Sequence, residues 1–215
     1  MFNINDKEEI IIRDQKIRVY SSFYTKPNLI FEKLLNTTPS FHKKNLQSYN
    51  GKKFLDLRHN DHMKELEDMI DYFEDLVGER CNHKGKNFTT NMQKWFRDPF
   101  NDYKNNYWWP HRDDGHTLLI YLNEESHNGL NIYEDNAYFL EEQTQYHEHI
   151  KPWHSKKHYE LLKHFKVPFN TAILFPGDVF LHGCAVNNNF YFDNFRLSQS
   201  IFFDHNFNVL NSPTI

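Results

Sequence analysis

The sequence has few of the residues that mark specialised structural classes. Its 215 residues include only two cysteines, Cys81 and Cys184, too few for a disulfide framework. Seven glycines and eight prolines exclude a collagen-like or linker-dominated chain. No apolar run approaches the ~20 residues of a membrane-spanning helix, and the first residues lack the layout of a signal peptide. We therefore expect a cytoplasmic protein without membrane contact.

An excess of basic charge is also missing. The chain has 25 Lys and Arg against 29 Asp and Glu, a net charge of -4, which argues against a generally basic nucleic-acid binder and leaves only a local patch open. Aromatic residues, in contrast, make up 17% of the chain, which excludes intrinsic disorder. At this length roughly 70% of the unfolded surface can be buried, so residues 1–215 can form a single domain with its own core.

Hydrophobic periodicity predicts strands or a hairpin near the N-terminus, then two helices, and then many strands. The helices are expected from Thr25 to just before Pro39 and from Asn60 or Asp61 to Gly78. Strands are predicted at residues 10–20, 88–96, 117–122, 171–175, 179–182 and 196–203. Residues 134–168 are polar, so we expect an insertion or lid there, helical from Ser155 to Phe165. This order predicts an α+β, mainly β fold with helices on one face of an antiparallel sheet or barrel.

The most informative polar residues are His111, Asp113 and His182. On an extended chain residues i and i+2 point to the same side, so His111 and Asp113 face one point. His182 follows a Pro-Gly-Asp turn at the end of a short apolar run and supplies a second imidazole. Two histidines and one carboxylate form a facial triad with open positions, which suits Fe(II) better than structural zinc. The alternatives are a surface pair on a loop and a core histidine.

Arg196 and Ser198 are expected on one face of the last strand, with Leu197, Ile201 and Phe203 on the other. A guanidinium beside a hydroxyl suits a carboxylate, because arginine presents a planar fork that binds it in a bidentate manner. The alternative is a surface arginine on the strand. The sequence therefore predicts a metal site and an anion site on the same inner surface.

In this order, His111-x-Asp113, His182 and Arg196-x-Ser198 resemble the signature of Fe(II)/2-oxoglutarate-dependent dioxygenases. The flanking segments are similar to the prolyl-4-hydroxylase-like branch, and the resemblance covers roughly residues 88–204: Tyr121-Leu122-Asn123, Asn128-Gly129-Leu130, Leu174-Phe175-Pro176-Gly177-Asp178 and His182-Gly183-Cys184-Ala185-Val186. The resemblance implies a double-stranded β-helix (jelly-roll) core with supporting N-terminal helices and iron at one mouth.

The resemblance also implies the cofactors and the reaction. Fe(II), held by the triad, would bind 2-oxoglutarate and dioxygen, and the far carboxylate of 2-oxoglutarate would meet Arg196 and Ser198. Tyr121 either hydrogen-bonds that carboxylate or is a plain core tyrosine. Succinate and CO2 are the expected products besides the modified substrate. Hydroxylation is expected because Asp113 is present, whereas the related halogenases have a small residue at that place in the motif.

The substrate is expected to be a small metabolite, an amino acid or a residue in a peptide. Trp109 and Arg112 are the candidates for contact with it, with core packing as the alternative for Trp109. Nucleic acid is disfavoured because the chain lacks the second arginine of the demethylase branch. The five histidines between residues 147 and 164 are expected on a solvated face. The competing function is a non-enzymatic, cupin-like jelly-roll module that binds a metal or a ligand. The sequence makes no prediction of oligomeric state.

Overall fold

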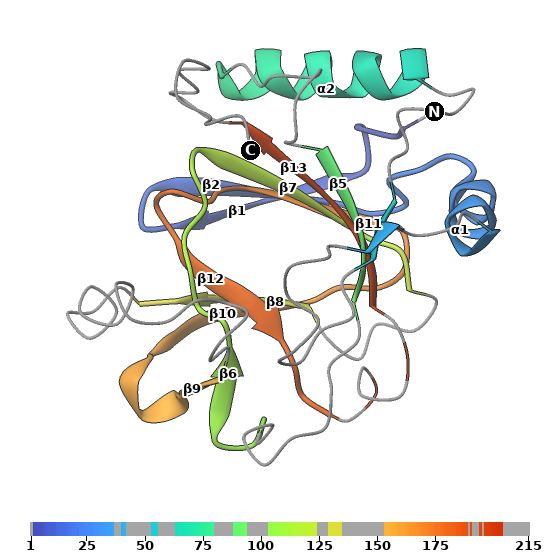
Figure 1. Cartoon of the computed structure of the whole chain (residues 1–215). Helices are drawn as coiled ribbons and strands as arrows, with labels where there is room; N and C mark the ends of the chain where they lie inside the picture. The colour runs from blue at the N-terminus through green and yellow to red at the C-terminus, as the bar shows by residue number, and fades with distance from the viewer. Residues whose placement is uncertain are drawn as a thin grey trace, which may run out of the picture.

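The protein is mostly β-sheet with few helices, as the computed structural model shows (Figure 1). The structure describes residues 2–36, 40–41, 53–55, 63–79, 88–93, 103–123, 129–134, 153–188, 190, 194 and 196–203. The expectation of a mainly β fold with two helices near the N-terminus is confirmed for this part of the chain. The strands are arranged in one large sheet and two smaller ones.

The large sheet brings together strands that lie far apart in the sequence, and all its pairs are antiparallel. Its order is β1 (Lys7–Ile12), β2 (Gln15–Tyr20), β11 (Thr171–Pro176), β7 (His116–Tyr121), β13 (Arg196–Phe203), β5 (Phe88–Gln93), β4 (Lys53–Leu55) and β3 (Ser40–Phe41). The central position of β13, between β5 and β7, fixes its register from both sides.

A smaller sheet faces the large one. It contains β10 (Leu161–Lys166), β8 (Gly129–Tyr133) and β12 (Leu181–Ala185), and a two-stranded sheet of β6 (Asn106–Trp108) and β9 (Trp153–Ser155) lies beside it. Ile17 and Ile173 of the large sheet share an apolar cluster with Leu130, Ile132 and Phe165 of the smaller one. The two sheets therefore pack face to face, as in Figure 1, where β8 and β12 lie opposite β7 and β13.

The helix α2 (Met63–Val77) covers the outer face of the large sheet (Figure 1). Met69, Ile70 and Phe73 are buried in one cluster with Leu118 of β7 and Ile201 of β13. This confirms the expected role of the helix as support for a sheet. The other helix, α1 (Pro27–Asn36), also packs apolar residues against this cluster. Neither described helix combines the length and the apolar character needed to cross a membrane.

The N-terminal segment is tied to the sheet by a compact hydrogen-bond network. The Tyr24 amide donates to Oδ1 of Asn170 (2.8 Å), and Nδ2 of Asn170 donates to the Tyr24 carbonyl (2.9 Å). The Tyr24 hydroxyl donates to Oε1 of Gln199 on β13 (2.7 Å). These buried bonds connect three distant segments and hold the inner strand β13 on its core side.

The prediction of a helix from Ser155 to Phe165 is wrong. Only Lys156–His158 are helical, as a single 3-10 turn, and residues 161–166 form β10, which pairs with β8. The end of the expected insertion is therefore part of a sheet, while residues 135–152 lie outside the described residues. The strand expected at 179–182 begins later, at Leu181, because Gly177–Val179 form a turn.

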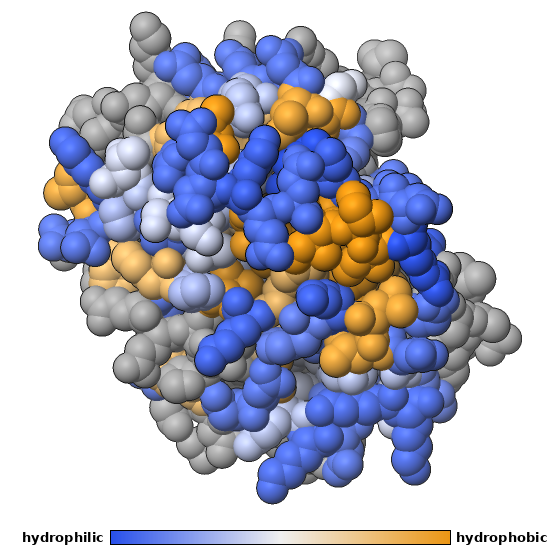
Figure 2. Space-filling view, turned by 180° about the vertical axis from the view of Figure 1, so that it is seen from behind, coloured by the Kyte–Doolittle hydropathy of each residue, from blue (hydrophilic) through white to orange (hydrophobic). Residues whose placement is uncertain are grey.

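The surface is mostly polar, with apolar areas between the charged groups (Figure 2). Among the described residues, the large apolar side chains with substantial exposure are Ile11, Leu29, Leu161 and Val179. They lie on different elements, since Ile11 belongs to the edge strand β1 and Leu29 to α1.

Candidate metal centre

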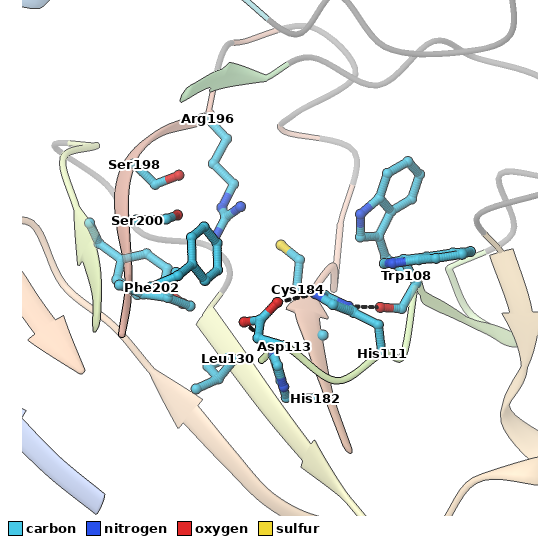
Figure 3. A pocket seen from close by; sticks show the side chains of 14 residues that line it. Trp108, His111, Asp113, Leu130, His182, Cys184, Arg196, Ser198, Ser200 and Phe202 are labelled. Atoms are coloured by element: carbon cyan, nitrogen blue, oxygen red, sulfur yellow. Dashed lines mark hydrogen bonds and ion pairs between the residues drawn. The ribbon is translucent and has the colours of Figure 1, made fainter. Parts of the chain in front are cut away.

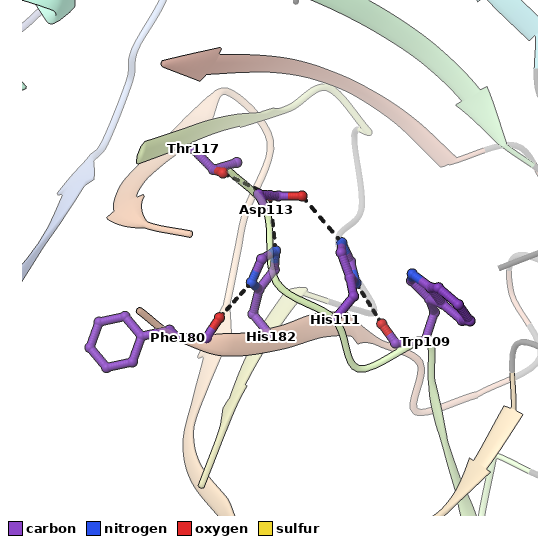
Figure 4. A network of polar contacts seen from close by, with 6 residues as sticks. All are labelled: Trp109, His111, Asp113, Thr117, Phe180 and His182. Atoms are coloured by element: carbon purple, nitrogen blue, oxygen red, sulfur yellow. Dashed lines mark hydrogen bonds and ion pairs between the residues drawn. The ribbon is translucent and has the colours of Figure 1, made fainter. Parts of the chain in front are cut away.

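His111, Asp113 and His182 meet at one point, and one potential ligand atom from each lies within 4.8 Å of the others (Figure 4). Nε2 of His182 is 3.1 Å from Oδ2 of Asp113, and Nε2 of His111 is 3.6 Å from Oδ1 of the same carboxylate. The two imidazole rings have centroids 4.5 Å apart. The structure thus brings together the three side chains that the sequence selects as metal ligands.

The main chain holds the two histidines opposite each other. The His111 amide donates to the His182 carbonyl, and the His182 amide donates to the His111 carbonyl, both at 2.8 Å. The Asp113 amide donates to the Gly177 carbonyl at 3.1 Å. A Cβ at Gly177 would lie 2.5 Å from Oγ1 of Thr117, so the turn after β11 needs glycine to approach this closely. The segments that carry the ligands therefore brace each other.

Each imidazole is oriented by a carbonyl two residues earlier in the chain. Nδ1 of His111 lies 2.7 Å from the Trp109 carbonyl oxygen, and Nδ1 of His182 lies 2.9 Å from the Phe180 carbonyl oxygen. A carbonyl only accepts, so both Nδ1 atoms carry the proton and donate it. In the neutral rings the lone pair is then on Nε2, the atom that faces Asp113 (Figure 4).

The charges at this point fit a cation. Burial raises the pKa of Asp113, but the positive charge that the His182 and His111 rings carry when protonated and a hydrogen bond from Oγ1 of Thr117 (2.7 Å) outweigh it and hold the pKa well below its usual range. Once both rings are neutral, the ionised carboxylate and the two Nε2 lone pairs repel one another unless another positive charge lies between them. A divalent metal ion supplies that charge, and the nitrogen and oxygen donors suit a transition metal.

A cavity of about 290 Å³ extends from the metal ligands between the two facing sheets (Figure 3). Asp113 and the two histidines form one wall. Alternate residues of β13 form another wall, and Figure 3 shows Arg196, Ser198 and Ser200 projecting from one side of that strand. The rest is largely apolar: Trp108, Trp109, Leu119, Leu130 and Phe202. The cavity therefore combines a candidate metal site, a cation and apolar side chains on its remaining sides.

Arg196 is the cationic side chain among the described residues of the cavity wall. Only 9% of the residue is exposed, and its guanidinium carbon lies 5.3 Å from the centre of the Tyr121 ring. A cation over an aromatic face is stabilised by the ring quadrupole. Ser198, 2% exposed, follows on the same face. This arrangement can bind a small anion inside the cavity, away from bulk water.

Cys184 also lines the cavity, with its sulfur directed inward (Figure 3). Burial raises the pKa of its thiol, and the opposing charge of Arg196 does not reverse this. The group stays a neutral thiol rather than the thiolate that binds metals. The donor set of the three facing ligands therefore remains two nitrogens and a carboxylate.

Most of the residues selected from the sequence line the cavity. His111, Asp113, His182, Arg196, Ser198, Tyr121 and Trp109 all do so, whereas Arg112 does not. Sequence reasoning missed Ser200, Phe202 and Cys184. The signal was present, because the same alternation that pairs Arg196 with Ser198 continues to Ser200 and Phe202, and places Cys184 beside His182.

Two further histidines, His154 and His116, make contacts outside the metal centre. His154 is buried, with Nδ1 3.3 Å from the Tyr159 hydroxyl, so the expectation of solvent exposure is wrong for this residue. His116 is not among the three facing ligands. Its Nδ1 lies 2.5 Å from Oε1 of the buried Glu79, which also accepts from the His116 amide through Oε2. This pair anchors the start of β7 just after Asp113.

Comparisons with known proteins give little beyond this geometry. No family model matches the chain, and no curated protein matches it. Among solved structures, the chain is similar to a protein of Shewanella oneidensis described as a "Putative oxygenase", with a TM-score of 0.47 and 11% identity over 88% of this chain and 81% of that chain. A likeness at this level carries no argument about function, which is therefore argued from the site alone.

Proposed function

We propose that the protein is a non-haem Fe(II)- and 2-oxoglutarate-dependent dioxygenase. It hydroxylates a C–H bond of a small metabolite, an amino acid or a peptidyl residue and releases succinate and CO2. The observation that supports this is the content of one cavity: two imidazoles and an ionised carboxylate on one wall, and a buried guanidinium on another. An isolated metal site would not need the arginine, and an isolated anion site would not need the triad.

The triad suits iron because it supplies two nitrogens and one carboxylate from one side. His111, Asp113 and His182 would hold the ion and leave its remaining positions open toward the cavity. Fe(II), when bound, supplies the activation of dioxygen coupled to oxidative decarboxylation of 2-oxoglutarate. The protein contributes ring orientation through the carbonyls of Trp109 and Phe180.

The opposite wall suits the far carboxylate of 2-oxoglutarate. The guanidinium of Arg196 offers a planar pair of donors, and the Ser198 hydroxyl lies on the same face of β13. An ion pair formed in a cavity lined by Trp108, Leu119 and Phe202 is screened less than one in water. Arg196 would therefore orient the co-substrate so that its keto acid end points toward the triad.

Two structural assignments belong to the same proposal. The facing antiparallel sheets, with the cavity between β7, β13, β8 and β12, are proposed to be the two halves of a double-stranded β-helix. A reducing cytoplasmic setting, which keeps iron ferrous, agrees with the free thiol of Cys184. Neither assignment is needed for the chemistry of the cavity.

The test is to assemble the protein anaerobically with Fe(II) and 2-oxoglutarate and then admit air. We expect a visible charge-transfer band on assembly and succinate after exposure to oxygen, increased by the correct substrate in a library of amino acids and peptides. His182→Ala should abolish both signals. Metal or ligand binding without any succinate, coupled or uncoupled, would instead identify a non-enzymatic binding module.

A further inference from the structure

Trp109 adopts a backbone conformation that both its own side chain and the next residue disfavour. Its φ angle is 36°, in the left-handed region that bulky L-residues rarely occupy. The next residue is Pro110, and a residue before proline is restricted mainly to extended conformations. A strained backbone of this kind persists only where the surrounding structure enforces it, and such strain concentrates at functional sites.

The strained residue makes a direct contact with the metal centre. Its carbonyl oxygen accepts the hydrogen bond from Nδ1 of His111 at 2.7 Å (Figure 4). That bond decides which nitrogen carries the proton and which faces Asp113. His182 is oriented in the same manner by Phe180, whose φ is not positive. The His111 and His182 rings are thus held by equivalent hydrogen bonds to main-chain carbonyls. Only the bond to His111 depends on a residue with a disfavoured backbone conformation, Trp109.

Packing around Trp109 prevents the backbone from relaxing. The indole lies tilted against the His111 ring at 6.2 Å and meets the buried His154 ring edge-on at 5.8 Å. On the other side the main chain presses on Gly183, where a Cβ would lie 2.6 Å from the Trp108 carbonyl oxygen and 3.1 Å from that of Trp109. The indole of this partly buried residue therefore packs against two rings, while its main chain lies close beside a glycine.

From these contacts we infer that Trp109 is a positioning residue for the metal ligand His111. Packing of the indole holds the left-handed backbone, and the backbone presents the carbonyl that turns Nε2 of His111 toward Asp113. This inference rests on the proposed function, because His111 needs a fixed lone pair only as a ligand. It gives Trp109 a role beyond that of a cavity wall or substrate contact.

The test compares three substitutions of Trp109 by the Co(II) affinity of the otherwise complete protein, measured from the visible spectrum without 2-oxoglutarate. Trp109→Phe keeps an aromatic ring, so its Co(II) affinity should stay within about threefold of the wild type. This is less than the ~10-fold loss usual when a group that orients a metal ligand is removed. Trp109→Ala loses the packing but still disfavours positive φ, so its affinity should fall ~10-fold or more. Trp109→Gly also loses the packing but accepts positive φ, and should bind more tightly than Trp109→Ala.

A higher Co(II) affinity in Trp109→Gly than in Trp109→Ala identifies a backbone role for Trp109. If the indole were only a wall of the cavity, both variants would lose it equally and bind Co(II) equally. Ser22 provides the matched control, because it also has a positive φ (52°) and does not line the cavity. Ser22→Gly should be more stable to thermal unfolding than Ser22→Ala, with equal Co(II) affinity in both. Thermal unfolding of the Trp109 variants shows whether each remains folded at the temperature of the titration.

A second readout needs no metal. At about pH 8, above the ordinary pKa of histidine, long-range proton–nitrogen spectra report which nitrogen of His111 carries the proton. We expect the Nδ1–H form in the wild type and in Trp109→Gly, and its loss in Trp109→Ala. Equal affinities and equal spectra in the alanine and glycine variants would overturn the inference. Metal binding without succinate formation would overturn the proposed function while leaving this order of variants intact.

Discussion

The two polar walls of the cavity are built in different ways. The metal wall joins the short non-strand segment of His111 and Asp113 to strand β12, which carries His182. The paired amides and carbonyls of His111 and His182 and the bond from Thr117 to Asp113 brace it. The wall of Arg196, Ser198 and Ser200 is one face of a regular strand with partners on both sides. On the first wall, geometry depends on local backbone detail. On the second it depends on strand register, so single side chains can change without moving their neighbours.

The substitution His182→Ala is expected to give the largest difference between metal affinity, which depends on the first wall, and 2-oxoglutarate affinity, which depends on the second. Loss of a ligand should lower Fe(II) or Co(II) affinity by more than ~100-fold, the largest effect usual for groups that only orient a ligand. The affinity for 2-oxoglutarate should lose only the part that depends on the bound metal. Anaerobic metal titration measures this. His164→Ala is the control, because His164 is exposed and bonded to Asn131 rather than to the triad. Unchanged metal affinity in His182→Ala would remove this residue from the site.

The next effect concerns the strand wall. Arg196→Ala should weaken 2-oxoglutarate binding ~100-fold, since it removes charge-assisted hydrogen bonds of about 1.5–3 kcal/mol. Arg196→Lys keeps the charge but not the planar fork and should be intermediate. Metal affinity without co-substrate should stay unchanged in both. A parallel loss of metal affinity would show that the walls are not independent.

A smaller effect is expected from Gly183→Ala on the metal wall. The added Cβ would meet the Trp108 carbonyl oxygen at 2.6 Å and displace the segment that leads to His111. We expect metal affinity to fall ~10-fold, as for other groups that orient a ligand. Ser200→Ala changes a cavity residue on the other wall and should leave metal affinity as it is. Equal titration curves for Gly183→Ala and the wild type would mean that the metal wall tolerates backbone shifts.

The smallest effect is expected from Thr117→Val, which removes a single hydroxyl. The variant keeps the shape of the side chain but loses the 2.7 Å bond to Asp113, which favours the ionised carboxylate. Metal affinity should fall by no more than ~10-fold, and the pKa of Asp113 in the metal-free protein should rise. Thr171→Val makes the same change on β11, away from Asp113, and should alter neither quantity.

The site was largely predictable because its residues follow simple alternation. His111 with Asp113 and Arg196 with Ser198 are two residues apart on extended chain, and the structure places each pair in the cavity. The same rule, carried further, gives Ser200 and Phe202. The conformation of Trp109 was not predictable, because no local preference favours positive φ for a tryptophan before proline. Tertiary packing overrides local preference there.

The fold was predictable where strands are buried on both faces, and not where pairing is irregular. Residues 171–175 are apolar throughout and form β11 as expected. In β10 the register shifts between Leu161 and Lys163 opposite β8, so the apolar residues do not alternate regularly. A strand with such a bulge has no period of two to detect, so the sequence pattern did not identify β10.

The central position of β13 has a consequence for engineering this protein. Positions 198, 200 and 202 can be randomised together, because their side chains enter the cavity while Leu197, Ile201 and Phe203 stay in the core beneath. A library of this kind would vary ligand preference on an unchanged scaffold. Insertion of one residue that shifts the register of β13 would instead exchange its two faces. Leu197 would then face the cavity and the charge of Arg196 would lie in the core, which would lower the free energy of unfolding by several kcal/mol.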